Sequence, residues 1–239
     1  MKLDILVLPV HPDDAELGCA GTIVKEIALG KKVGIVDLTR GELGTRGSAE
    51  IRDQEAAESA KILGLAVRDN LSIPDGFFTN TREYQLKVIE AIRRFKPEIV
   101  ITNAYHDRHP DHGRANELVE ASAFLSGLRK IETTYNNEAQ EAWRPKQVLH
   151  FIQDNYIKPD ILVDVTEHWD KKIASIRAFG SQFFNPNWQN EPQTYISSPN
   201  FIEVVEARAR EFGKSIGVKY AEGFTSRKIL GVDSLFDLR

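Results

Sequence analysis

Residues 3–14, LDILVLPVHPDD, combine a clear strand pattern with a group of chemically reactive side chains. The run from residue 3 to residue 10 is almost continuously apolar, as in a parallel strand that is buried on both faces. A histidine and two aspartates follow it at once. Titratable side chains directly after such a strand are typical of an α/β sheet, in which ligands bind beyond the carboxyl ends of the strands.

Downstream of this strand, helical and strand patterns alternate. The predicted helices cover residues 16–29, 48–63, 82–95 and 113–128, and further strands are predicted at 33–38 and 98–102. Gly30 ends the first helix and Ser48 is an N-cap for the second. The alternation predicts parallel βαβ units with right-handed crossovers. We therefore expect a Rossmann-like, doubly wound α/β fold, with a mainly parallel sheet and helices on both faces.

The second half of the chain is less regular. Strand patterns lie at residues 147–152 and 160–165, helical patterns at 166–179 and 202–216, and polar stretches at 132–146 and 185–200. We find no linker, repeat or low-complexity segment. We therefore expect a single domain over residues 1–239, in which residues 1–130 form the Rossmann-like core and residues 131–239 complete the sheet and the pocket.

Composition and charge narrow the class of protein. The 239 residues are 41% hydrophobic and 28% charged, which is an ordinary globular balance, and the net charge of −4 lacks the basic footprint of a general nucleic-acid binder. The single cysteine, Cys19, excludes an internal disulfide and a thiolate zinc cluster, and it fits a cytoplasmic protein. No run of about 18 apolar residues predicts a membrane span, and residues 1–10 lack the cleavage site of a signal peptide.

The segment 106–112, HDRHPDH, holds three of the six histidines and directly follows the strand predicted at 98–102. In a strand order such as 3-2-1-4-5, with 98–102 as the fourth strand, this segment and residues 11–14 open onto the same crevice. Clustered imidazoles and carboxylates suit a divalent metal such as zinc. The alternative for residues 11–14 alone is a turn with a helix N-cap, but two such segments after two strands favour the metal site.

These two segments, HPDDAELG at 11–18 and DRHPDH at 107–112, resemble the LmbE-like family, also called PIG-L deacetylases. The family hydrolyses N-acetyl groups of N-acetylglucosamine derivatives with zinc. The similarity extends to DLTRGE at 37–42, IRDQE at 51–55, SQF at 181–183 and YAEGF at 220–224, so it spans nearly the whole chain. It is greatest to the bacterial branch that contains the N-acetylglucosaminyl-malate deacetylases of bacillithiol biosynthesis.

The resemblance implies a role for each residue of the two motifs. The implied metal ligands are His11, Asp14 and His112, with Zn²⁺ as the cofactor and Fe²⁺ as the alternative. Asp13 is the implied general base toward the attacking water. His109 is the implied acid, which stabilises the tetrahedral intermediate or protonates the departing amine. Asp111 is implied to orient it and to favour its charged form.

Substrate binding is implied for Arg52 and Arg108, because a guanidinium presents a fork of donors to carboxylates and hydroxyls. The alternative for Arg52 is an ordinary helix residue that pairs with Glu55 or Glu58.

The family's tyrosine for oxyanion stabilisation aligns with Phe201, which has no hydroxyl. Either Tyr195 replaces it, or His109 and the metal suffice. Away from the motifs, we expect structural roles for His150 and His168 and no catalytic role for His106. Cys19 is expected in the core.

The sequence thus predicts a cytoplasmic, zinc-dependent N-deacetylase of a small amino-sugar conjugate, with N-acetylglucosaminyl-malate as the expected substrate. Two alternatives stay open: a metal amidohydrolase for another acyl group, and a metal-binding module without catalysis. Besides the substrate, the only expected partners are further copies of the chain in a homo-oligomer, a hexamer by resemblance. Neither nucleic acid nor membrane is expected as a partner.

Overall fold

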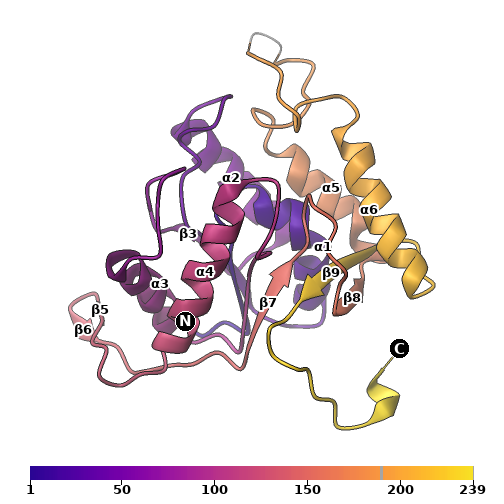
Figure 1. Ribbon diagram of the computed structural model, residues 1–239. Helices are drawn as coiled ribbons and strands as arrows, with labels where there is room; N and C mark the ends of the chain where they lie inside the picture. The colour runs from indigo at the N-terminus through magenta and orange to yellow at the C-terminus, as the bar shows by residue number, and fades with distance from the viewer. Residues whose placement is uncertain (189–190, 239) are drawn as a thin grey trace.

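A seven-stranded sheet forms the centre of the computed structural model, which describes residues 1–188 and 191–238 (Figure 1). Its strand order is β3-β2-β1-β4-β7-β9-β8. The strands are β1 (Ile5–Leu8), β2 (Val33–Asp37), β3 (Val67–Asn70), β4 (Ile99–Asn103), β7 (Gln147–Phe151), β8 (Ile161–Asp164) and β9 (Ala221–Thr225). The pairings from β3 to β7 are parallel, whereas β9 runs antiparallel to both of its neighbours. The predicted mainly parallel sheet is confirmed.

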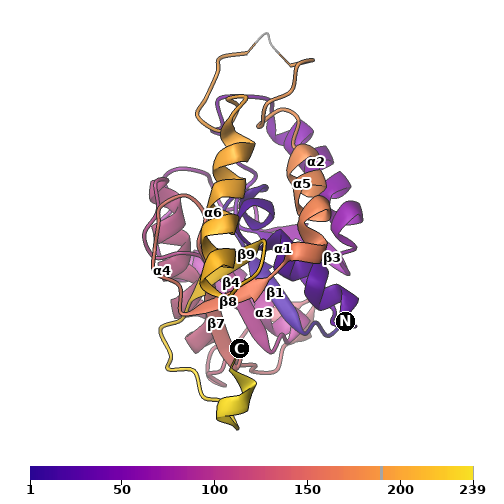
Figure 2. The same ribbon diagram turned by 90° about the vertical axis from the view of Figure 1, so that its right-hand side faces the viewer.

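Helices cover both faces of this sheet (Figures 1 and 2). On one face, α3 (Arg82–Phe95) and α4 (Pro110–Leu125) share a core with Leu6 and Leu8 of β1. On the other face, α1 (Asp14–Ala28) and α2 (Ala49–Leu63) pack around Ile5 and Val7. The remaining helices are α5 (Trp169–Arg177), which packs on α1 and α2, and α6 (Phe201–Ser215), which packs on β9. The doubly wound α/β fold in one domain is therefore confirmed.

Two strands of the sheet have no counterpart among the predicted strands. β3 has the sequence VRDN and is only half-buried, because it lies at the edge of the sheet, where its polar side chains reach solvent or charged partners. β9 lies beyond the last predicted element, which ends at residue 216. The polar stretch 132–146 also contains a small hairpin, β5 (Thr134–Tyr135) and β6 (Glu138–Ala139). Residues 189–190 of the stretch 185–200 lie outside the described residues.

The two helices that carry the motif residues, α1 and α4, begin earlier than predicted. α1 begins at Asp14 instead of residue 16, and α4 begins at Pro110 instead of residue 113. A proline is favoured in the first turn of a helix because its fixed φ is already helical. The segment 106–112 is therefore not all loop, since His112 lies on the first turn of α4. The helix predicted at 166–179 is a 3₁₀ turn, Thr166–His168, followed by α5.

Several smaller expectations hold. Ser48 caps α2 and accepts a hydrogen bond from the backbone N–H of Ile51 at 3.3 Å. Cys19 is completely buried in the core. Among the described residues, no helix is both long and apolar enough to cross a membrane.

A buried ion pair joins β9 to α1 and α5. Glu222 of β9 accepts hydrogen bonds from the backbone N–H groups of Gly21 at 2.9 Å and Thr22 at 2.7 Å. Lys172 of α5 donates to the same carboxylate at 2.6 Å and to the carbonyl of Leu17 at 2.7 Å. Because both charged side chains are at most 3% exposed, each depends on the other for its partner. The pair therefore fixes the late strand β9 to the helix that carries Asp14.

We expect Glu222→Ala to lower the free energy of unfolding by about 3–5 kcal/mol, because it leaves the Lys172 ammonium buried without its partner. The double variant Glu222→Leu, Lys172→Met should recover part of this loss, since it buries no charge, while the backbone N–H groups of Gly21 and Thr22 still lose their acceptor. Urea unfolding followed by circular dichroism measures both. The control is Glu211→Ala on the exposed face of α6, which should unfold at a midpoint close to that of the wild type. A wild-type midpoint for Glu222→Ala would contradict the role of the pair.

Candidate active site

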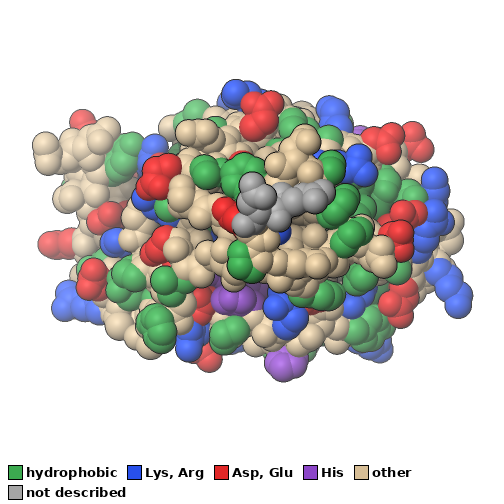
Figure 3. Space-filling view, turned by 90° about the horizontal axis from the view of Figure 1, so that it is seen from above, with side chains coloured by type: hydrophobic (Ala, Val, Ile, Leu, Met, Phe, Trp, Pro, Cys, Tyr) green, Lys and Arg blue, Asp and Glu red, His purple; other side chains and the backbone are tan. Residues whose placement is uncertain are grey.

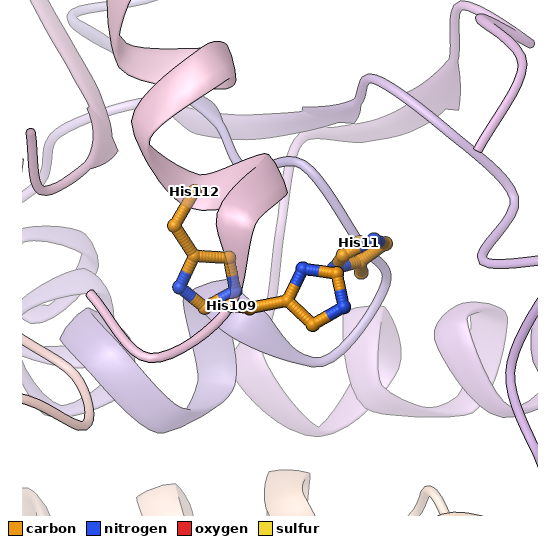
Figure 4. A group of neighbouring side chains, drawn as sticks. All are labelled: His11, His109 and His112. Atoms are coloured by element: carbon orange, nitrogen blue, oxygen red, sulfur yellow. The ribbon is translucent and has the colours of Figure 1, made fainter. Parts of the chain in front are cut away.

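The two motifs meet at the carboxyl edge of the sheet. β1 and β4 are paired in parallel, with Leu8 opposite Thr102, so the segments that follow them start side by side. Figure 4 shows His11 on the loop after β1, and His109 and His112 at the start of α4. The ring centroids of His11 and His109 are 4.8 Å apart, and those of His109 and His112 are 5.4 Å apart. Histidine side chains are also visible from outside in the view of Figure 3.

The loop after β1 is strained at Asp13. This residue holds the N-cap position of α1 with φ of 122°, a conformation that non-glycine residues rarely adopt. The Asp13 side chain makes no capping hydrogen bond to any described residue. Instead, the Asp14 carboxylate accepts the backbone N–H of His11 at 3.0 Å. Strain of this kind collects at functional sites, and it argues against helix capping as the purpose of the HPDD segment.

The three predicted ligand side chains converge around the Asp14 carboxylate. His11 Nδ1 lies 3.5 Å from Asp14 Oδ2, and His112 Nε2 lies 3.2 Å from Asp14 Oδ1. The other nitrogen of each ring contacts a different carboxylate: His11 Nε2 lies 2.9 Å from Asp75 Oδ1, and His112 Nδ1 lies 2.7 Å from Asp107 Oδ2. Imidazoles that bind a metal usually donate their second nitrogen to a carboxylate in this way. Among the described residues, the groups whose ligand atoms all lie within 4.8 Å of one another are His11, His109 and His112, and His11, Asp75 and Asp111. Clustered imidazoles and carboxylates of this kind suit a divalent metal. That His11, Asp14 and His112, here called the donor set, are its ligands stays a prediction.

Asp13 lies beside this donor set and is 5% exposed. Burial raises the pKa of its carboxyl to about 7; the Arg52 guanidinium, whose Nη2 lies 3.9 Å from Asp13 Oδ2, opposes the rise, and the neighbouring Asp14 adds to it. A carboxylate with a pKa near neutrality is suited to accept and return a proton. The geometry therefore provides a proton acceptor that stands next to the donor set without being part of it.

His109 holds the N-cap position of α4, where its Nδ1 accepts the backbone N–H of Asp111 at 3.3 Å. A ring that accepts at Nδ1 carries its proton at Nε2. Burial, together with the charges of His11 and His112, lowers the pKa of His109 and favours the neutral form, in contrast to the charged form that Asp111 was expected to favour. The site thus contains an imidazole that is prepared to donate one hydrogen bond from Nε2.

The Asp111 carboxylate faces other partners than His109. Arg114 Nη1 donates to it at 2.6 Å and the backbone N–H of Gly76 at 2.9 Å, and its Oδ2 lies 3.7 Å from His11 Nε2. It is the backbone amide of Asp111 that contacts His109. That the Asp111 side chain orients His109 stays a prediction.

The two predicted substrate arginines have different surroundings. Arg52 is buried and donates to the Gln182 side chain, and a Cβ at Gly41 would overlap its guanidinium. Glu55, considered as its partner, instead accepts hydrogen bonds from Ser181. Arg108 is among the residues that line the pocket around His11, Asp13 and His109, and its side chain is half exposed.

Tyr195 was the alternative source of the hydroxyl that Phe201 lacks, and this role stays a prediction. It lines the pocket, and the Arg108 guanidinium lies 5.0 Å from the centroid of its ring. Its hydroxyl donates to Asp154 Oδ1 at 3.2 Å, and its ring packs edge-on against Phe201, with the centroids 5.2 Å apart. His106 is exposed and is not among the residues that line the pocket.

The polar residues of the site that have no role in the predicted set include Asp75, Asp107 and Gln153, of which Gln153 donates to Asp14 Oδ1 at 2.8 Å. Each lies a few residues beyond a strand, at the same edge of the sheet as the histidines. Their position shortly after parallel strands was therefore the signal in the sequence that could have identified them as site residues. Asp75 belonged to a turn pattern, Pro74-Asp75-Gly76, and Asp107 to the second motif.

Comparison with known proteins identifies the family of the chain. The family model described as GlcNAc-PI de-N-acetylase, PIG-L, matches residues 6–123, which include both motifs. A diacetylchitobiose deacetylase of Thermococcus kodakarensis is 30% identical over 232 residues, which cover 92% of this chain and 81% of that protein. The crystal structure of a conserved protein from Thermus thermophilus is 38% identical, covers 97% of this chain and 98% of that one, and has a TM-score of 0.84.

A third relative is named for a different reaction. A 4-oxalmesaconate hydratase of Pseudomonas putida is 25% identical over 193 residues, which cover 74% of this chain and 73% of that protein. Membership of the family therefore does not by itself fix the reaction. Since the 30% identity to the first relative extends over nearly the whole chain, and the family model spans both motifs, the chain belongs to the PIG-L, or LmbE-like, family of de-N-acetylases.

Proposed function

We propose that the protein is a metal-dependent hydrolase that removes the N-acetyl group from a small molecule containing N-acetylglucosamine. The observation that carries the proposal is that Asp13 and His109 line the same pocket as His11, Asp14 and His112. A proton acceptor and a hydrogen-bond donor beside a divalent-metal site are the groups that amide hydrolysis needs.

The proposed cofactor is Zn²⁺, with Fe²⁺ as the alternative, held by His11 Nδ1, the Asp14 carboxylate and His112 Nε2. When bound, such a metal lowers the pKa of water and polarises the acetamide carbonyl. Three protein ligands leave coordination positions for water and substrate.

The chain's own residues would handle the protons and the developing charge. Asp13 accepts a proton from the attacking water and returns it to the amine nitrogen, because an amide anion is a very poor leaving group. His109 donates a hydrogen bond from Nε2 to the carbonyl oxygen as negative charge develops there. Because its Nδ1 accepts the backbone N–H of Asp111, a neutral ring that donates this hydrogen bond is favoured over an imidazolium that transfers a proton. The products are acetate and a free amine.

N-acetylglucosaminyl-malate is the proposed substrate within this class. Malate adds carboxylates to the sugar. Arg108 lines the pocket with a half-exposed side chain, and although its Nε binds Asp154, its Nη groups are donors that suit a carboxylate. Similarity to a diacetylchitobiose deacetylase supports the broader class of N-acetylglucosamine compounds. A cytoplasmic location and a homo-oligomer are parts of the same proposal.

The decisive experiment is an assay of acetate release by the zinc-loaded protein. The panel contains N-acetylglucosaminyl-malate, N,N′-diacetylchitobiose and a propionyl analogue of each, so that both the aglycone and the acyl group vary. Hydration of 4-oxalmesaconate is measured in parallel, because one relative is named for that reaction. Release of acetate from either N-acetyl compound is expected. Hydration of 4-oxalmesaconate without any acetate release would refute the deacetylase proposal. Inactivity on the whole panel would favour a metal-binding module.

Asp13→Asn separates proton transfer from metal binding. We expect kcat to fall by about 10²–10⁴-fold, because the amide cannot accept the proton. Metal content, measured by mass spectrometry of the purified protein, should stay that of the wild type. The matched control is Asp14→Asn, which removes a proposed ligand and should lose metal as well as activity. Wild-type kcat in Asp13→Asn would exclude it as the base.

Asp107→Asn tests the support of a proposed ligand. The Asp107 carboxylate lies 2.7 Å from His112 Nδ1, so the variant should weaken metal binding by about 10–100-fold while it leaves every proposed ligand in place. Competition for Zn²⁺ with a chromophoric chelator measures the affinity. The matched control is Asp154→Asn, since Asp154 contacts Arg108 and Tyr195 instead of the donor set. Equal zinc affinity in wild type and Asp107→Asn would contradict the role of Asp107 in supporting His112.

A further inference from the structure

The C-terminal arm, residues 229–238, exposes a series of large apolar side chains. Ile229 is 93% exposed, Leu235 79% and Phe236 97%. Their exposed apolar neighbours on the arm are Leu230, Val232 and Leu238. Single exposed apolar residues are common on protein surfaces, but a contiguous set is characteristic of an interaction site.

The arm is ordered locally and donates no hydrogen bond to the body among the described residues. Ser234 and Asp237 form a capping box around the 3₁₀ turn Leu235–Asp237, which holds the apolar side chains in a defined arrangement. Among the described residues, each hydrogen bond that the arm donates is accepted by another residue of the arm. Figures 1 and 2 show this segment projecting below the body of the protein.

The root of the arm, in contrast, is tied to the body. Arg227 donates to Asn116 Oδ1 at 2.8 Å, and Lys228 donates to the carbonyl of Lys146 at 3.4 Å. The direction in which the arm leaves the body is therefore set by the fold.

A complementary surface lies beside this root. We call it the basal groove; it is lined by Glu120, Ala123, Phe124, Arg144, Pro145, Lys146, Gln147, Val148, Arg227 and Lys228. Phe124, one of the lining residues, is 59% exposed, and the Arg144 guanidinium lies 4.2 Å from the centroid of its ring. Four cationic side chains and one carboxylate line the groove, whereas the arm carries Asp233 and Asp237 and neither lysine nor arginine. Both apolar character and charge are therefore complementary.

We infer that the arm of one copy of this chain packs into the basal groove of a second copy. Residues 227–228 already form part of the groove, and the chain then leads away from it, so the arm departs from its own groove (Figure 1). A two-fold axis lets two copies exchange arms, so that each contact is made twice. A stable interface needs roughly 800 Å² from each partner, more than one ten-residue segment offers by itself. The groove lies where β7 begins, at the edge opposite the histidines, so the exchange leaves the candidate active site open.

Sedimentation equilibrium over a range of concentrations tests this exchange. The wild type should be oligomeric, and a chain that stops after Lys228 should associate into fewer copies. Phe236→Asp should weaken self-association by roughly 30-fold or more, as expected for a buried aromatic anchor. The matched control is Leu29→Asp, which adds the same charge at another exposed apolar position, 65% exposed at the end of α1, and should associate like the wild type. A monomeric wild type, or unchanged association of Phe236→Asp, would overturn the inference.

Cross-linking then identifies the surface that the arm contacts. Two differently tagged chains are co-expressed, one with Phe124→Cys and the other with Phe236→Cys. The native Cys19 is completely buried, so the introduced thiols are the reactive ones in the folded protein. Oxidation should give a disulfide between the two tags. Cross-linking within one chain of the double variant, with none between the tagged chains, would show an arm that folds back on its own body and would refute the exchange.

Discussion

β1 and β4 are neighbours in the sheet, with Val7 opposite Ile101 and Leu8 opposite Thr102, and the arrangement of the site follows from this parallel pairing. Parallel strands end at the same edge, so two segments about ninety residues apart in sequence start within one strand spacing of each other. Asn103 fastens the junction, because its Oδ1 accepts the N–H of Val10 and its Nδ2 donates to Asp14 Oδ2. Thus one residue at the end of β4 sets both the course of the first loop and the position of its carboxylate.

Such an arrangement is costly in isolation. Asp13 is held in a sparsely populated backbone conformation, which costs about 1–3 kcal/mol, and it is buried close to Asp14, which adds desolvation and repulsion. The cost is offset by the strand that precedes it. All four residues of β1 are buried and contribute to the cores on both faces of the sheet, so the loop cannot relax without disturbing both. Rigid packing beneath a strained, charged loop is what keeps the proton acceptor and the donor set in place.

How much could be predicted from the sequence depended on how local the information was. β1, β2 and β4 are continuous apolar runs, and both motifs are short strings of residues, so pattern and resemblance were enough. β3 escaped because its Arg68 and Asp69 find their partners through tertiary contacts with Asp37 and Arg94. Asp75 escaped as a partner of His11 for the same reason, since 64 residues separate the two and only the folded chain brings them together.

The second half of the chain does more than extend the sheet. β9 lies between β7 and β8, and its Glu222 holds the backbone of α1 at Gly21 and Thr22. Gln153, two residues after β7, donates to the Asp14 carboxylate, which is also fixed by Asn103 from the first half. Asp14 is therefore positioned from both halves at once. Residues 1–130 contain every proposed ligand, yet without the later strands they would lack one of the two amides that orient the central carboxylate, and the anchor of the helix that carries it.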